Sequence, residues 1–93
     1  MGSKKTGGDR ILVEKVQTGL RMEKRVVKVL KALAEYYDMT PGDLLEGILL
    51  HVFEGKVPFS KESVKRIQEL KRIYGLNLDS SASHRLDEQK HSK

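Results

Sequence analysis

Seven residues near the N-terminus, residues 16–22 (VQTGLRM), alternate between two kinds of side chain. The apolar or β-favouring positions are Val16, Thr18, Leu20 and Met22, and the positions between them are Gln17, Gly19 and Arg21. A period of two is typical of a β-strand with one buried face. A single strand leaves its backbone N–H and C=O groups unpaired. We therefore expect two chains to pair these segments in an antiparallel ribbon, which would make the protein a homodimer.

The size of the chain favours the same conclusion. Ninety-three residues form one small domain, close to the size at which a single core is only just sufficient. The sequence contains no cysteine, so neither disulfides nor thiolate metal sites can reinforce the fold. No apolar run approaches the ~20 residues of a membrane-spanning helix, and no signal-peptide pattern opens the chain. We expect a soluble cytoplasmic protein that makes no membrane contact.

A helix is predicted to follow the strand, from about residue 23 to residue 38. Val26, Leu30, Leu33 and Tyr37 recur at helical spacing and form one apolar stripe. The start is weakly marked, because glutamate at position 23 is not a favoured N-cap. Asp38 tolerates the left-handed conformation that commonly ends a helix.

The segment Thr40-Pro41-Gly42-Asp43 predicts the start of a second helix, which runs to about residue 54 and is closed by Gly55. Threonine is a good N-cap, proline suits the first helical position, and a carboxylate three residues after the cap completes a capping box. Apolar side chains surround most of this helix, so it must be covered from more than one side. We expect the dimer core to consist of Val16, Thr18, Leu20 and Met22 of the strand with Leu45, Ile48, Leu49 and Val52 of this helix.

A third helix is predicted after Ser60, with a narrow apolar stripe and a C-terminal cap at Gly75. The chain then divides into four parts. These are a flexible arm (1–14), a dimerisation and binding module (15–55), an additional amphipathic helix (56–79) and a polar, disordered tail (80–93).

Charge is segregated along the chain. Residues 16–31 carry five basic side chains and one acidic one, whereas residues 32–55 carry five acidic side chains and no lysine or arginine. The basic residues of the first segment are Arg21, Lys24, Arg25, Lys28 and Lys31. A positive charge gathered on the strand and the first helix indicates a polyanionic partner on that side.

The order of strand, helix, capped turn and very apolar helix resembles the ribbon-helix-helix family of DNA-binding proteins, the Arc/MetJ-like and CopG-like repressors. The resemblance spans residues 15–55. It rests on the alternating QTGLRM at positions 17–22, on the Leu33-Ala34 pair, and on the turn at residues 40–43 followed by Leu44-Leu45. The fold class that it implies is mostly α, a ribbon-helix-helix with one additional C-terminal helix.

The resemblance also implies how double-stranded DNA would be bound. In that family a two-stranded ribbon enters the major groove, and its outward side chains contact base edges. By position, the base-contacting residues here are Gln17, Gly19 and Arg21, although glycine has no side chain with which to read a base. The backbone-contacting residues are Lys15, Lys24, Arg25, Thr40 and Gly42, the last two at a helix N-terminus that can receive a phosphate.

The function expected is therefore transcriptional regulation by a DNA-binding homodimer, repressor-like and nucleoid-associated if the protein is prokaryotic. Two alternatives stay open. Residues 56–93 could bind a protein partner, as the C-terminal extensions of antitoxins do, or the dimer could be a scaffold without DNA binding.

Catalysis, metal binding and cofactors receive no support from the sequence. There is no Ser-His-Asp order, phosphate loop or glycine fingerprint, and no two histidines are spaced to share a metal on one helix face. The tyrosines Tyr36, Tyr37 and Tyr74 are interpreted as core or rim residues. We expect no enzyme activity, metal or cofactor.

Overall fold

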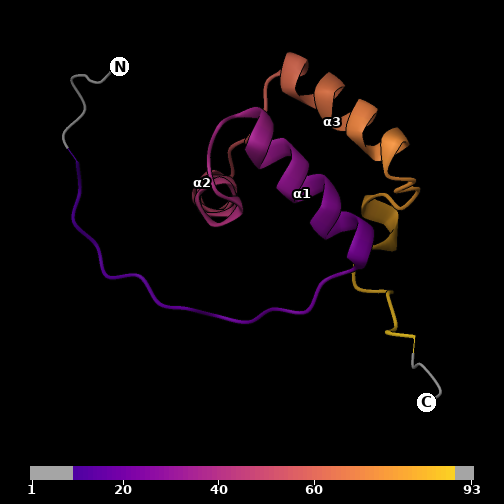
Figure 1. Cartoon of the computed structure of the whole chain (residues 1–93), viewed down its shortest axis with the longest axis horizontal. Helices are drawn as coiled ribbons and strands as arrows, with labels where there is room; N and C mark the ends of the chain where they lie inside the picture. Colours follow the sequence, from indigo (N-terminus) through magenta and orange to yellow (C-terminus); the bar gives the residue numbers. More distant parts are fainter. Residues whose placement is uncertain (1–9, 90–93) are drawn as a thin grey trace.

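The computed structural model describes residues 10–89 and shows three α-helices of equal length (Figure 1). They are α1 (Lys24–Tyr36), α2 (Pro41–Phe53) and α3 (Lys61–Ile73), followed by a single 3₁₀ turn, η2 (Ser80–Ala82). The prediction of a mostly helical fold is confirmed. Helix α1 packs against both α2 and α3, and so it lies between them.

The predicted N-terminal strand, and with it the ribbon, is wrong: residues 10–89 contain no β-strand. Residues 10–22 form an extended segment before α1 (Figure 1). We call this segment the arm from here on; it shares only residues 10–14 with the predicted flexible arm. No backbone hydrogen bond within the described chain involves the arm. Alternation specifies which face of a strand is apolar, but a strand also needs a neighbouring strand to accept its backbone hydrogen bonds. Nothing in residues 10–89 supplies one. The part of the predicted flexible arm that precedes residue 10 lies outside the described residues.

Each helix begins at a side chain that accepts hydrogen bonds from the first free backbone N–H groups. The predicted caps Thr40 and Ser60 accept from the backbone N–H groups of Asp43 and Ser63. Glu23, judged a poor cap from its residue type, caps α1 by accepting from the N–H groups of Arg25 and Val26. A carboxylate can do this because the helix N-terminus carries free donors and a partial positive charge.

The helices end where a residue adopts positive φ. Asp38 has φ of 60° after α1, as its residue type predicted. Gly55 after α2 and Gly75 after α3 have φ of 73° and 68°. This left-handed conformation costs glycine nothing, which is why it commonly follows a helix C-terminus.

The core is very small and lies near the C-terminal end of α1. Leu33 and Ala34, with 3% and 1% of their surface exposed, pack with Leu44 of α2. Because consecutive helical residues point about 100° apart, burial of both requires α1 to have neighbours on two flanks. Half-buried side chains that surround this cluster are Leu30, Tyr37, Ile48, Phe59, Ile67 and Leu70.

Candidate nucleic-acid interface

The arm presents the predicted base-contacting residues to solvent. Gln17, Gly19 and Arg21 are all exposed, and no atom lies within 4 Å of the position that a side chain at Gly19 would occupy. The Arg21 guanidinium pairs with the Glu88 carboxylate, with 3.0 Å between Nε and Oε1. This contact lowers the pKa of Glu88 and raises that of Arg21. Arg21, which was predicted to contact a DNA base, is thus paired with a carboxylate of the same chain.

Lys15 ties the arm to the beginning of α2. Its ammonium lies 3.0 Å from Oε1 of Glu46 and 3.2 Å from Oδ1 of Asp43, and these two carboxylates raise its pKa. Asp43 therefore pairs with the arm in addition to its place in the first turn of α2. Because all three side chains are about half exposed, this contact positions the arm more than it stabilises the fold.

Helix α1 carries a row of exposed lysines on one face. Lys24, Lys28 and Lys31 are spaced by four and three residues, and all three are exposed. None of them forms an ion pair within residues 10–89. Their charge is therefore available to an external anion.

Arg25, predicted to contact the DNA backbone, is instead engaged inside the molecule. Its Nη1 donates to the backbone oxygen of Gly75 at 3.0 Å and to Oδ1 of Asn77 at 3.1 Å. Its Nε donates to Oε2 of Glu23 at 2.9 Å. Arg25 thereby joins the start of α1 to the end of α3.

Those contacts also act on Glu23. Partial burial alone would raise the pKa of Glu23, but the hydrogen bonds from the Arg25 side chain and from the backbone N–H groups of Val26 and Arg25 outweigh it. The net result is a pKa of Glu23 below its ordinary value.

The N-terminus of α2 is exposed but already capped. The Thr40 hydroxyl accepts from the N–H of Asp43 at 3.1 Å, and Gly42 faces solvent next to it. The carboxylates of Asp43 and Glu46 make this end acidic, with Lys15 as their partner. An approaching phosphate would have to displace or recruit that lysine.

The side chains predicted to form the dimer core are largely exposed in the single chain. Val16, Leu20 and Met22 are 81%, 67% and 41% exposed, and Thr18 is exposed as well. On α2, Leu49 and Val52 are exposed, whereas Leu45 and Ile48 are half-buried. Leu50 and Phe53 add further exposed apolar surface to α2. The side of α2 turned away from α1 is therefore uncovered.

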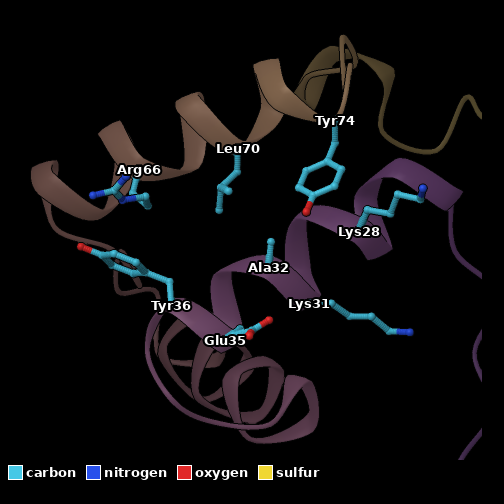
Figure 2. Close-up of a pocket in the computed structure, with 8 residues that line it drawn as sticks. All are labelled: Lys28, Lys31, Ala32, Glu35, Tyr36, Arg66, Leu70 and Tyr74. Carbon is cyan, nitrogen blue, oxygen red and sulfur yellow. The ribbon is translucent and has the colours of Figure 1, made fainter.

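A groove between α1 and α3 was missed by the sequence reasoning. It is lined by Lys28, Lys31, Ala32, Glu35 and Tyr36 of α1, by Arg66 and Leu70 of α3, and by Tyr74, which directly follows α3 (Figure 2). A signal was available, because positions 28, 32 and 36 share one face of a helix at spacings of four. The tyrosines were interpreted as core or rim residues; in the structure Tyr36 is 56% and Tyr74 is 37% exposed.

Other kinds of site find no support in the described chain. Residues 10–89 contain no group of three or more histidine, aspartate or glutamate side chains placed to hold a metal ion. No helix among them is long and apolar enough to cross a membrane. Comparison with protein-family models, with curated proteins and with solved structures gave no match to this chain.

Proposed function

We propose that the protein is a homodimer that binds double-stranded DNA and regulates transcription. The observation that carries this proposal is the separation of charge between elements that lie side by side. Exposed lysines line one face of α1, whereas α2 is acidic. The arm adds Arg10, and its Lys15 and Arg21 are paired with carboxylates in the free protein. Such a basic surface favours phosphate, which supplies most of the free energy of non-specific DNA binding.

The arm supplies the part of the proposal that concerns base recognition. It is extended (Figure 1), and its polar residues Gln17 and Arg21 are exposed. Arginine can donate two hydrogen bonds to guanine, and glutamine can pair with adenine. Arg21 would leave Glu88 on binding DNA, which replaces one acidic partner with another.

The proposal of a homodimer is supported by the uncovered side of α2. Leu50, Val52 and Phe53 are 66%, 51% and 75% exposed on a helix that, among the described helices, packs against α1 alone. Contiguous apolar surface of this kind is a usual mark of a protein interface. A cytoplasmic location, nucleoid-associated if the protein is prokaryotic, accompanies this function.

The test is binding-site selection from random duplexes, followed by fluorescence anisotropy on the selected duplex at several salt concentrations. We expect Arg21→Ala to cost roughly 1–3 kcal/mol on the selected site and to relax the preference at one base position. Lys24→Ala should weaken all sequences equally and reduce the salt slope by about 1. Lys56→Ala is the matched control, because Lys56 pairs with Glu54 outside the basic surface.

Two results would contradict the proposal. One is failure of the wild-type chain to bind any duplex at low salt, as a scaffold would. The other is equal loss for Arg21→Ala on every sequence, which would make Arg21 a phosphate contact and remove the arm from base recognition.

A second candidate is a protein-binding role for residues 56–93, of the antitoxin type. It is favoured by the exposed apolar side chains of this region, with Val57, Ile73 and Leu86 at 79%, 71% and 52% exposure. Co-purification of a partner with the full chain, and its loss on removal of residues 56–93, would support this role. Retention on DNA that weakens steeply with salt would support the first candidate.

A further inference from the structure

The groove between α1 and α3 has the size and the mixed lining of a ligand site. It is a shallow groove open to solvent, and its volume of about 550 Å³ is in the range of roughly 300–1,000 Å³ typical of small-molecule pockets. Figure 2 shows Ala32 of α1 and Leu70 of α3 facing each other across it, with Arg66 and Tyr36 at one end and Tyr74 at the other. The floor is apolar and the ends are aromatic or charged.

At one end of the groove, Arg66 stacks on Tyr36. The guanidinium of Arg66 lies over the ring of Tyr36, 4.5 Å from its centroid. The Tyr36 ring meets Tyr37 edge to face at 5.2 Å, which fixes its orientation. Nη1 of Arg66 donates to Oε1 of Glu69 at 2.7 Å, whereas its Nε is buried and has no acceptor within the described chain. The Arg66 guanidinium is thus held in place by the Tyr36 ring and by Glu69.

The other polar groups of the groove are also without partners in the described chain. Lys28 and Lys31 form no ion pair, and the Tyr74 hydroxyl forms no hydrogen bond with residues 10–89. Figure 2 shows that this hydroxyl points towards α1 beside Lys28. Glu35 is the one carboxylate in the lining, against three cationic side chains.

We propose that this groove binds an unpaired nucleotide, either free or within a single-stranded nucleic acid. The base would lie in the groove beside Ala32 and Leu70, between Tyr74 and the Arg66–Tyr36 pair. The phosphate would lie with Lys28 and Lys31. Stacking on aromatic side chains combined with a positively charged groove is the general mode by which proteins hold unpaired bases.

The lining favours a nucleotide over a bare phosphate or a duplex backbone. A phosphate needs donors and charge alone, and it gains nothing from Ala32, Leu70 or the face of an aromatic ring. The bases of a duplex are stacked on one another and cannot enter between two helices. This site belongs to α3 as much as to α1, so it goes beyond the proposed binding of duplex DNA by the arm.

The test uses the full chain in an NMR titration with adenosine 5′-monophosphate, followed by calorimetry. We expect the amide signals of Ala32 and Leu70 to shift on binding. Adenosine alone and inorganic phosphate alone should each bind at least about tenfold more weakly than the nucleotide, because each keeps only one half of the interaction. A short unpaired oligoadenylate distinguishes the sources: tighter binding than the free nucleotide identifies single-stranded nucleic acid, and weaker binding identifies a free nucleotide.

The key variant is Tyr74→Ala, which removes the ring and leaves the charge of the groove unchanged. We expect it to weaken nucleotide binding roughly tenfold. Tyr74→Phe keeps the aromatic ring and should retain most of the wild-type affinity. Lys65→Ala, which removes an exposed cation of α3 outside the groove, should have no effect. Circular dichroism checks that each variant keeps its helices.

The proposal is overturned if inorganic phosphate binds as tightly as the nucleotide, if Tyr74→Ala binds the nucleotide normally, or if the signals that shift lie outside the groove. Its failure is separable from failure of the duplex proposal. Tyr74→Ala should bind the selected duplex like the wild type, and Arg21→Ala should bind the nucleotide like the wild type.

Discussion

At the scale of single residues, the charged side chains divide into those that hold the chain to itself and those that are available to partners. Arg25 and Glu23 belong to the first group, since their hydrogen bonds join the start of α1 to the residues after α3. Lys24, the neighbour of both, is exposed and has no ion-pair partner in residues 10–89. Adjacent basic residues in the sequence thus have different roles, and only the structure separates them.

Acid should weaken the fold partly through Glu23. Its pKa is lowered in the folded state, so the ionised form stabilises the fold above the ordinary value of 4.5 and this contribution is lost as the pH falls through the lowered value. We expect Glu23→Gln to start less stable at neutral pH and to lose less free energy of unfolding than the wild type below about pH 4.5. Urea unfolding followed by circular dichroism across pH 3–7 measures the difference.

Asp79 and Glu88 also have lowered pKa values. They change the stability of the wild type and of Glu23→Gln equally as the pH falls, so their contributions cancel in this comparison. Parallel curves of stability against pH for the wild type and Glu23→Gln would show that Glu23 is not responsible.

At the scale of elements, the helices were predictable and the arm was not. The start of α2 follows from Thr40 and Pro41, and the ends of α2 and α3 follow from Gly55 and Gly75, because these are local preferences of single residues. The alternation in residues 16–22 is equally local, but a β-strand depends on a partner that the pattern does not contain. The prediction was therefore wrong at the step from pattern to pairing.

The site was less predictable than the fold for a related reason. The lysines of α1 and the tyrosines were visible in the sequence, but the groove depends on how α3 lies against α1. Helical spacing predicts which residues share a face of one helix, and it does not predict which two faces meet. Arg66 and Tyr36, which stack, are thirty positions apart.

The cap of α2 provides a test at this scale. Thr40→Ala leaves the N–H of Asp43 without its acceptor, and we expect a loss of about 1 kcal/mol in the free energy of unfolding. Thr40→Ser keeps the hydroxyl and should lose much less. Urea unfolding at one fixed protein concentration measures both. Equal losses for the two variants would mean that the methyl group of Thr40, and not its hydroxyl, matters.

At the scale of the whole molecule, the described chain buries few apolar side chains and exposes many. The buried side chains are Val29, Leu33, Ala34 and Leu44, whereas apolar residues of the arm and α2 face solvent. Folding of a small domain normally requires more buried surface than this to offset the loss of conformational entropy. The proposed homodimer would supply it.

We expect Val52→Glu to shift the equilibrium from dimer to monomer by at least about tenfold in dissociation constant, because a carboxylate would then have to be buried in the interface. Ile73→Glu is the control, since it places the same charge on an exposed apolar position of α3. Sedimentation equilibrium measures the masses. A monomeric wild type, or equal effects of the two substitutions, would remove α2 from the proposed interface.

The small cluster around Leu33 and Ala34 has a consequence for temperature. The increase in heat capacity on unfolding grows with the apolar surface that becomes exposed. An isolated chain that exposes so little apolar surface therefore has a stability that depends only weakly on temperature. Its calorimetric transition would be broad and would lack a steep midpoint. Heating would then act on this protein mainly by separating its copies, and its melting temperature would rise with the logarithm of its concentration.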